Sequence, residues 1–251
     1  MIDILNPLKY NVFGGKFSTK NTIGRGVLLK GLPKIVIICG HYGVGKTNVS
    51  LNIAYKYKQM GERVYLVDLD VVNPYFVSSI YKSEIEEQGI RLISPQFANS
   101  NLDHPSLPAE INSIFSDDCE RAIIDVGGDD AGSTALGTIA KAIKRYNYCF
   151  FYVINKYRVL TTEAEKAAEL LPEIEKASRL QATGIINNSH LSNWTKADDI
   201  FAAMPFAQSV SELTKLPLSF TTVPEHIAKE AEGKIANMLP VSIHVKKPWE
   251  S

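Results

Sequence analysis

The sequence predicts an α/β domain, with a mostly parallel, doubly wound sheet and helices on both faces. Short apolar runs rich in β-branched residues are typical of strands buried on both faces. Segments with helical spacing of apolar residues lie between these runs, as βαβ units require. The expected strands are residues 34–39, 63–68, 90–94, 121–125, 148–155 and 182–187. The expected helices are residues 48–60, 84–88, 109–115, 135–145 and 162–179.

The two ends of the chain differ from this regular pattern. Residues 1–33 contain seven scattered residues of Gly or Pro and no sustained period, so we expect an extension before a domain that spans residues 34–251. Residues 241–245 alternate between apolar and polar types and predict an edge strand. A chain of 251 residues is long enough for one large α/β domain with a real core.

Composition excludes several functional classes. Apolar residues make up 45% and charged residues 22%, which is typical of a globular protein. Lys+Arg and Asp+Glu both total 27, so net charge favours neither nucleic acid nor an anionic membrane. The N-terminus lacks the pattern of a signal peptide. Cys39, Cys119 and Cys149 form no CxxC pair. We therefore expect free thiols in a reducing cytosol, a cytoplasmic location and no iron–sulfur cluster.

A phosphate-binding motif connects the first strand to the first helix. Residues 40–47, Gly-His-Tyr-Gly-Val-Gly-Lys-Thr, match the Walker A pattern GxxxxGK[ST]. Glycines let successive N–H groups face phosphate oxygens, and the helix dipole adds positive potential. The motif assigns Lys46 to the β- and γ-phosphates and Thr47 to Mg²⁺. The residues expected at the nucleotide are Gly40, His41, Tyr42, Gly43, Val44, Gly45, Lys46, Thr47 and Asn48.

Acidic residues end two further strands. Asp68 and Asp70 close the second strand, where Mg²⁺ and an attacking water would lie beside the phosphate loop. Asp125 ends another strand and begins a DxxG pattern that places Gly128 where its N–H can approach a γ-phosphate. Residues 129–130 are both Asp, and they either extend this site or are solvated loop charges.

Together these motifs resemble the MinD/ParA group of P-loop ATPases, within the class that includes nitrogenase iron protein and signal-recognition GTPases. The similarity covers roughly residues 34–230. It implies a P-loop NTPase fold and hydrolysis of ATP with Mg²⁺. Within the group the second aspartate of the pair positions the hydrolytic water, which corresponds to Asp70 as a catalytic residue beside Lys46. Asp68 and Asp125 would support the metal with Thr47.

The resemblance also implies where the base binds. Asn187 ends a late strand and Pro224 follows a later one, which matches the adenine-contacting positions of the group. Residues 155–158, Asn-Lys-Tyr-Arg, end in Arg158 where the guanine-binding NKxD motif has Asp. Because Arg has only donors and guanine requires an acceptor there, the sequence favours ATP.

One departure concerns assembly and function. The family places a lysine beside its first glycine, which crosses a dimer to the partner's nucleotide, and this chain has His41. We therefore expect a homodimer formed mainly through a nucleotide-independent surface.

The function that these motifs favour is an ATP-hydrolysing switch that acts on an unidentified protein partner. Two alternatives stay open. One is a small-molecule kinase or ATP-dependent ligase of the dethiobiotin-synthetase type, with residues 73–108 as the acceptor pocket. The other is a nucleotide-binding scaffold with negligible turnover.

Overall fold

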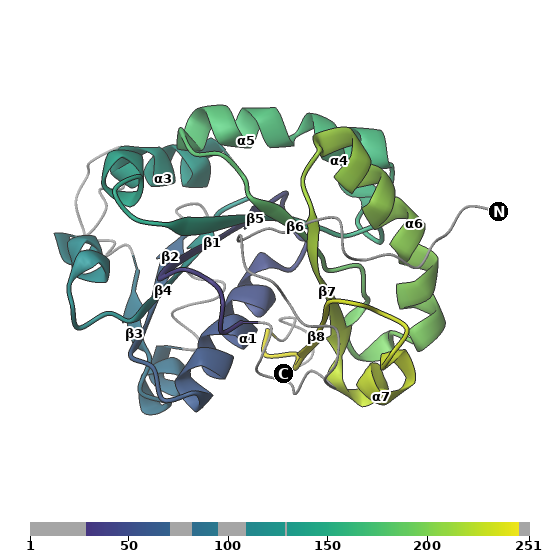
Figure 1. The fold of residues 1–251 in the computed structure, drawn as a ribbon, viewed down its shortest axis with the longest axis horizontal. Coiled ribbons are helices and arrows are strands. Elements are labelled where there is room, and N and C mark those ends of the chain that lie inside the picture. The colour runs from purple at the N-terminus through teal and green to yellow at the C-terminus, as the bar shows by residue number, and fades with distance from the viewer. Residues whose placement is uncertain (1–28, 71–81, 95–108, 129, 246–251) are drawn as a thin grey trace.

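The chain folds around one eight-stranded parallel sheet with helices on both faces (Figure 1). The computed structural model describes residues 29–70, 82–94, 109–128 and 130–245. The strand order is β3-β2-β4-β1-β5-β6-β7-β8. This arrangement confirms the predicted doubly wound α/β fold.

The strands are β1 (Ile35–Gly40), β2 (Val64–Leu69), β3 (Arg91–Ile93), β4 (Arg121–Val126), β5 (Tyr148–Ile154), β6 (Gly184–Asn187), β7 (Leu218–Pro224) and β8 (Met238–Val241). The α-helices are α1 (Lys46–Gln59), α3 (Asp130–Ile143), α4 (Ala164–Glu169), α5 (Leu171–Ser178), α6 (Ala197–Thr214) and α7 (Ala228–Ala231). The 3-10 helices are η2 (Ala109–Phe115), η3 (Val159–Thr161), η4 (Ser192–Trp194) and η5 (Glu225–Ile227). Residues 82–87 are also helical.

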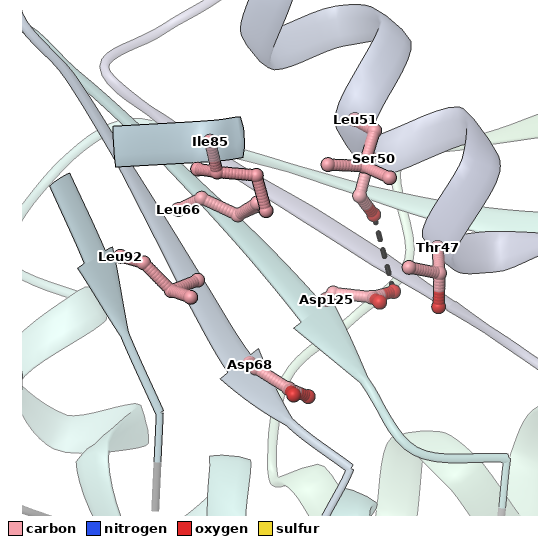
Figure 2. Close-up of a pocket in the computed structure, with 8 residues that line it drawn as sticks. All are labelled: Thr47, Ser50, Leu51, Leu66, Asp68, Ile85, Leu92 and Asp125. Atoms are coloured by element: carbon pink, nitrogen blue, oxygen red, sulfur yellow. Dashed lines mark hydrogen bonds between the residues drawn. The ribbon is translucent and has the colours of Figure 1, made fainter. Parts of the chain in front are cut away.

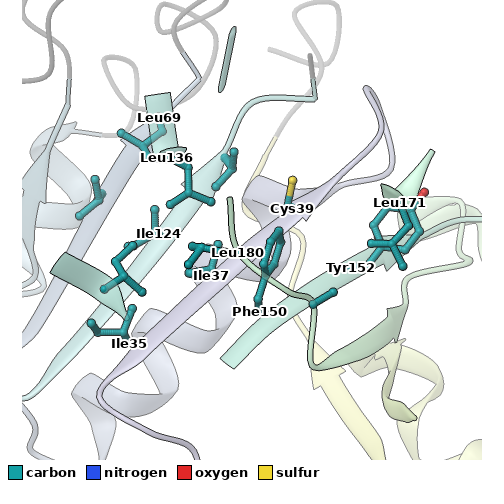
Figure 3. Packing of buried hydrophobic residues seen from close by; sticks show 14 of the residues in the cluster. Ile35, Ile37, Cys39, Leu69, Ile124, Leu136, Phe150, Tyr152, Leu171 and Leu180 are labelled. Carbon is teal, nitrogen blue, oxygen red and sulfur yellow. The ribbon is translucent and has the colours of Figure 1, made fainter. Parts of the chain in front are cut away.

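The centre of the sheet is β1, which is buried along its whole length between β4 and β5. Its alternate residues supply two cores, and Figure 3 shows the one that contains Ile35, Ile37 and Cys39. Ile37 belongs to the core that contains Leu136 of α3 and Leu171 of α5, whereas Ile38 belongs to the core beneath α1 that contains Ile53. The continuous apolar runs of the sequence are therefore explained by burial on both sides.

Parallel pairing also brings the site residues to one edge of the sheet. Asp68 in β2 pairs with Asp125 in β4, and Gly40 in β1 pairs with Val153 in β5. A Cβ atom on Gly40 would overlap the carbonyl oxygen of Val153, so only glycine fits where the chain leaves β1. The phosphate-binding loop therefore begins beside the acidic strand ends.

Three element predictions were wrong in detail. The helix expected over residues 162–179 is split into η3, α4 and α5, because Pro172 starts a new helix at α5 and cannot continue the hydrogen bonding of α4. Residues 109–115 form a 3-10 helix. The edge strand expected over residues 241–245 is β8, which lies earlier, at Met238–Val241; pairing with β7 ends at Val241.

The end of the expected N-terminal extension packs on the domain. Leu29 and Leu32 are buried in the core beneath α1. The Tyr57 hydroxyl donates to the Leu29 carbonyl at 2.7 Å, and the Arg121 guanidinium donates to the Leu32 carbonyl at 2.7 Å. Asp129 and most of the proposed acceptor segment 73–108 lie outside the described residues. Among the described helices, none combines the length and the apolar character needed to cross a bilayer.

Candidate functional site

The phosphate-binding loop has the backbone geometry that its glycines predict. Gly43 and Gly45 have φ values of 76° and 92°, in the left-handed region that favours glycine. Gly45 is the N-cap of α1 and provides no side-chain cap to that helix. The first N–H groups of α1 therefore point towards the loop with the positive end of the helix dipole, which is a ready anion-binding arrangement.

Lys46 lies within this loop rather than on its surface. Its side chain is 7% exposed, and its Nζ donates to the His41 carbonyl at 3.1 Å. A buried ammonium is stable only beside acceptors and negative charge. The Asp125 carboxylate lies close enough for its charge to interact with that of Lys46. Lys46 is therefore held ready for an anionic ligand in the loop.

Two carboxylates and two hydroxyls meet next to Lys46, and Figure 2 shows them around one small cavity. Asp68 and Asp125 are each 5% exposed, and the Ser50 hydroxyl donates to Asp125 Oδ1 at 3.1 Å. Thr47 completes this polar end of the cavity. The rest of the lining is apolar and consists of Leu51, Leu66, Ile85 and Leu92. Hard oxygen donors of this kind fit Mg²⁺, which binds proteins through one or two carboxylates and keeps part of its water.

Burial raises the pKa of Asp125 to about 6. Hydrogen bonding from Thr47, the positive charge of Lys46 and the hydrogen bond from Ser50 oppose this rise, whereas the Asp70 carboxylate adds to it. Carboxylates crowded into a desolvated space favour a nearby cation. The acidic end of the cavity is therefore electrostatically suited to a divalent ion.

Asp70 and Gly128 connect this site to the segments that follow it. The Asp70 N–H donates to Asp68 Oδ1 at 2.9 Å, and this hydrogen bond connects the two aspartates at the end of β2. A Cβ atom on Gly128 would lie 2.5 Å from the Tyr42 nitrogen and 2.7 Å from its Cα. The DxxG segment therefore packs closely against the phosphate-binding loop.

The base-side prediction named Asn187, and the structure adds its neighbour Asn188. Asn187 is fully buried, and its Oδ1 accepts from the Ser189 N–H at 3.3 Å. Asn188 Nδ2 donates to the Val44 carbonyl at 2.7 Å, and so it binds the phosphate loop directly. Its Oδ1 accepts from the Thr222 hydroxyl at 2.6 Å. The sequence signal that points to Asn188 is the pair of adjacent Asn residues after a buried strand.

His190 forms a further hydrogen bond with the side-chain oxygen of Asn188. Its Nε2 lies 3.0 Å from Asn188 Oδ1, and its Nδ1 accepts from the Ser192 N–H at 3.2 Å. Since Nδ1 is the acceptor, Nε2 donates to Asn188 and the ring is neutral. Burial, together with the positive charges of Arg158 and His226, lowers the pKa of His190 to about 4. The amide of Asn188 therefore has a fixed orientation.

The remaining predicted residues lie around the loop with different side-chain roles. Pro224 ends β7 and precedes η5, where His226 Nε2 donates to the Thr195 carbonyl across 3.0 Å. Tyr42 is 66% exposed, and His41 Nδ1 lies 3.3 Å from the Tyr42 carbonyl. The Asn48 side chain points away from the loop and bonds to residues 242–245. Any contact of Asn48 with phosphate would therefore involve its backbone.

Comparisons with known proteins agree with this geometry. A family model described as the CobQ/CobB/MinD/ParA nucleotide-binding domain matches residues 35–213. No curated protein matches the chain. This family match confirms the resemblance to the MinD/ParA group.

Solved structures with the same fold include proteins of the signal recognition system. The chain is 22% identical to the 54 kDa signal recognition particle protein of Aeropyrum pernix in complex with GDP, with a TM-score of 0.52. It is 17% identical to chloroplast FtsY of Physcomitrella patens, with a TM-score of 0.53. These matches cover 76% and 75% of this chain but 42% and 58% of those chains. At such low identity they show a shared fold.

Proposed function

The chain belongs to the CobQ/CobB/MinD/ParA nucleotide-binding family, and we propose that it binds and hydrolyses ATP with Mg²⁺ as a switch acting on a protein partner. One observation carries the proposal: Lys46, Thr47 and the paired aspartates Asp68 and Asp125 meet at the carboxyl edge of the sheet. A triphosphate with bound Mg²⁺ fits this set of groups. The ammonium and the N–H groups at the start of α1 suit the phosphates, and the hydroxyl and the two carboxylates suit the metal ion.

Each residue would have a separate task. The N–H groups of the loop and the Lys46 ammonium hold the phosphates and balance the charge that develops on them. Thr47, Asp68 and Asp125 hold the metal, directly or through its water, and the bound ion would neutralise charge on the phosphate oxygens. Asp70 orients the attacking water, and its own orientation depends on the hydrogen bond between its N–H and Asp68. Positioning and electrostatics supply most of the rate in such reactions.

In a nucleotide switch, the presence of the γ-phosphate must change the conformation of a segment outside the phosphate site. We propose that the contact between Gly128 and Tyr42 transmits this change. We propose that ATP stabilises this contact between the backbone after Asp125 and the loop, and that hydrolysis weakens it. The exposed ring of Tyr42 lies at this junction, where a partner would sense the change. The expected setting is the cytoplasm.

We propose that the base is adenine, contacted by Asn187 and the loop after Pro224. The donor-only side chain of Arg158 supports ATP over GTP, although the related fold of the Aeropyrum protein holds GDP. Displacement of a fluorescent nucleotide by ATP and by GTP measures the choice. A preference for ATP of roughly tenfold, about 1.4 kcal/mol, is expected, and equal displacement would refute the base assignment.

We further propose a homodimer whose contacts do not depend on nucleotide, because His41 stands where the family has the lysine that contacts a partner's phosphate. Light scattering on Asp70→Ala, with and without ATP and Mg²⁺, tests this assembly. A dimer in both conditions supports the proposal, and a monomer that dimerises only with ATP overturns it.

The direct test of the proposed function is binding and turnover by the parent protein and by Lys46→Ala. Calorimetry with ATP and Mg²⁺ should show binding to the parent and no measurable binding to the variant. Phosphate release should be lost in the same variant. Normal ATP affinity in a folded Lys46→Ala protein would refute the phosphate-site assignment.

A further inference from the structure

Residues 242–245 follow β8 and are bonded to helix α1 by asparagine side chains. The Ser242 carbonyl accepts from Asn48 Nδ2 at 3.0 Å and from Asn52 Nδ2 at 2.8 Å. In return, the Ser242 N–H donates to Asn52 Oδ1 at 2.8 Å. The His244 N–H donates to Asn48 Oδ1 at 2.8 Å. Two amides on α1 thus replace the sheet neighbour that this segment would need as a strand.

These contacts come from one face of α1. Asn48, Asn52 and Tyr55 are spaced four and three residues apart, which aligns them along the helix. The Tyr55 and His244 rings lie 4.7 Å apart between centroids. Asn48 is 7% exposed and Asn52 is 3% exposed, so both amides are removed from water. Buried amides that lost these partners would remain unsatisfied, which makes the attachment specific.

Asn48 belongs to this attachment and to the first turn of α1 at the same time. It directly follows Thr47 at the N-terminus of the helix. N–H groups in a first helical turn have no carbonyl partner within the helix and are free to face an anion. The Val49 N–H already bonds to the Gly45 carbonyl at 3.2 Å, which leaves the groups before it for phosphate. The backbone of Asn48 therefore lies at the phosphate side while its amide is held by residues 242–245.

We infer that Asn48 is a positioning residue through which segment 242–245 orients the first turn of α1 for the triphosphate. The inference rests on the proposed ATP site and goes beyond it, because it makes a segment about 190 residues away in sequence part of nucleotide affinity. Attachment of the segment and binding of ATP then stabilise each other. The coupling is reciprocal: the free energy by which the attached segment strengthens ATP binding equals the free energy by which bound ATP strengthens the attachment.

The experiment breaks the attachment from each side, once in the segment and once in α1. His244→Pro removes the N–H that donates to Asn48 Oδ1 and leaves α1 unchanged. Asn52→Ala removes both bonds between Asn52 and Ser242, together with the bond from Asn52 Nδ2 to the Asn48 carbonyl. We expect each variant to bind ATP with Mg²⁺ roughly fivefold more weakly in calorimetry. Ser211→Ala is the matched control, since it loses a 2.6 Å hydrogen bond to the Leu216 carbonyl at the end of α6. It should lower thermal stability and leave ATP affinity unchanged.

Hydrogen exchange supplies a readout that a merely structural role would not change. In the parent protein, ATP with Mg²⁺ should slow exchange at the Ser242 and His244 amides. Parent-like ATP affinity in both folded variants, with exchange at these amides unaffected by ATP, overturns the inference and leaves the proposed function standing. A parent protein that binds no ATP overturns the proposed function instead, and the two failures are thereby distinguished.

Discussion

Replacement of Asn188 by alanine should weaken nucleotide binding and also destabilise the fold. Asn188 is 1% exposed and connects the Val44 carbonyl of the phosphate loop to Thr222 and His190. Alanine leaves these three groups without that partner. A buried polar group that loses its partner costs about 1–3 kcal/mol. The Thr222 hydroxyl can turn to the Asn187 carbonyl, at 3.3 Å, which recovers part of the loss.

The expected loss of unfolding free energy in Asn188→Ala is therefore about 2–4 kcal/mol. The expected loss of nucleotide affinity comes from the lost hydrogen bond to the Val44 carbonyl. Without this bond the phosphate loop is less ordered, and phosphate binding must order it again. An ordering cost of about 1.4–2.8 kcal/mol corresponds to roughly 10–100-fold in Kd. Calorimetry with ATP and Mg²⁺ measures the affinity, and denaturant unfolding measures the stability.

Two further variants separate the loop contact from general destabilisation. Asn188→Asp keeps oxygen acceptors for Thr222 and His190 but places an oxygen against the Val44 carbonyl, so ATP affinity should fall at least as far as in Asn188→Ala. Thr222→Val removes a bond to Asn188 and spares the bond to Val44, so stability should fall with little loss of affinity. An Asn188→Asp protein with the ATP affinity of the parent would refute the reasoning.

Three other perturbations follow from the same geometry. Asp70→Ala should keep ATP binding and slow hydrolysis by roughly 10²-fold in a phosphate-release assay, and parent-like turnover would remove Asp70 from the reaction. Ser50→Ala should raise the Mg²⁺ concentration needed for half-maximal turnover, because Asp125 loses the 3.1 Å bond that orients it; an unchanged Mg²⁺ requirement contradicts this role. His190 has a folded pKa of about 4, below its ordinary 6.5, so unfolding takes up a proton between these values. The free energy of unfolding should therefore fall as pH drops from 6.5 towards 4, by about 3 kcal/mol in all. His190→Asn should lack this pH dependence in urea titrations, and equal slopes would contradict it.

The sheet and the phosphate site were predictable because local signals and topology agree there. Strand β1 is apolar along its length, and a GxxxxGK[ST] motif after such a strand has few structural alternatives. Parallel strands then bring their carboxyl ends to one edge, so Asp68 and Asp125 could be placed near Lys46 without coordinates. Local pattern and tertiary contact favour the same arrangement in this half of the chain.

The later half was harder to predict from local pattern. Helix α6, which was not predicted, continues through Pro205, a residue that ordinarily ends a helix and is tolerated here within tertiary packing. Residues 241–245 alternate like a strand, yet beyond Val241 their N–H groups bond to Asn48 and Asn52. Such partners are distant in sequence, and no period reveals them. The same reason explains why Asn188 was missed, since its importance lies in one contact with Val44.

The phosphate loop owes its shape to contacts from three directions as well as to its glycines. Gly128, after β4, packs against Tyr42, and Asn188, after β6, donates to the Val44 carbonyl. Asn48 attaches the first turn of α1 to residues 242–245. A loop with left-handed backbone at Gly43 and Gly45 would sample many conformations if it were unsupported. Support fixed before binding lowers the entropy that phosphate must overcome. Of the three supports, the Gly128 contact leads into the segment proposed to change with nucleotide. In the proposed cycle, the Asn188 and Asn48 contacts would therefore hold the loop ready for nucleotide, and only the Gly128 contact would change with hydrolysis.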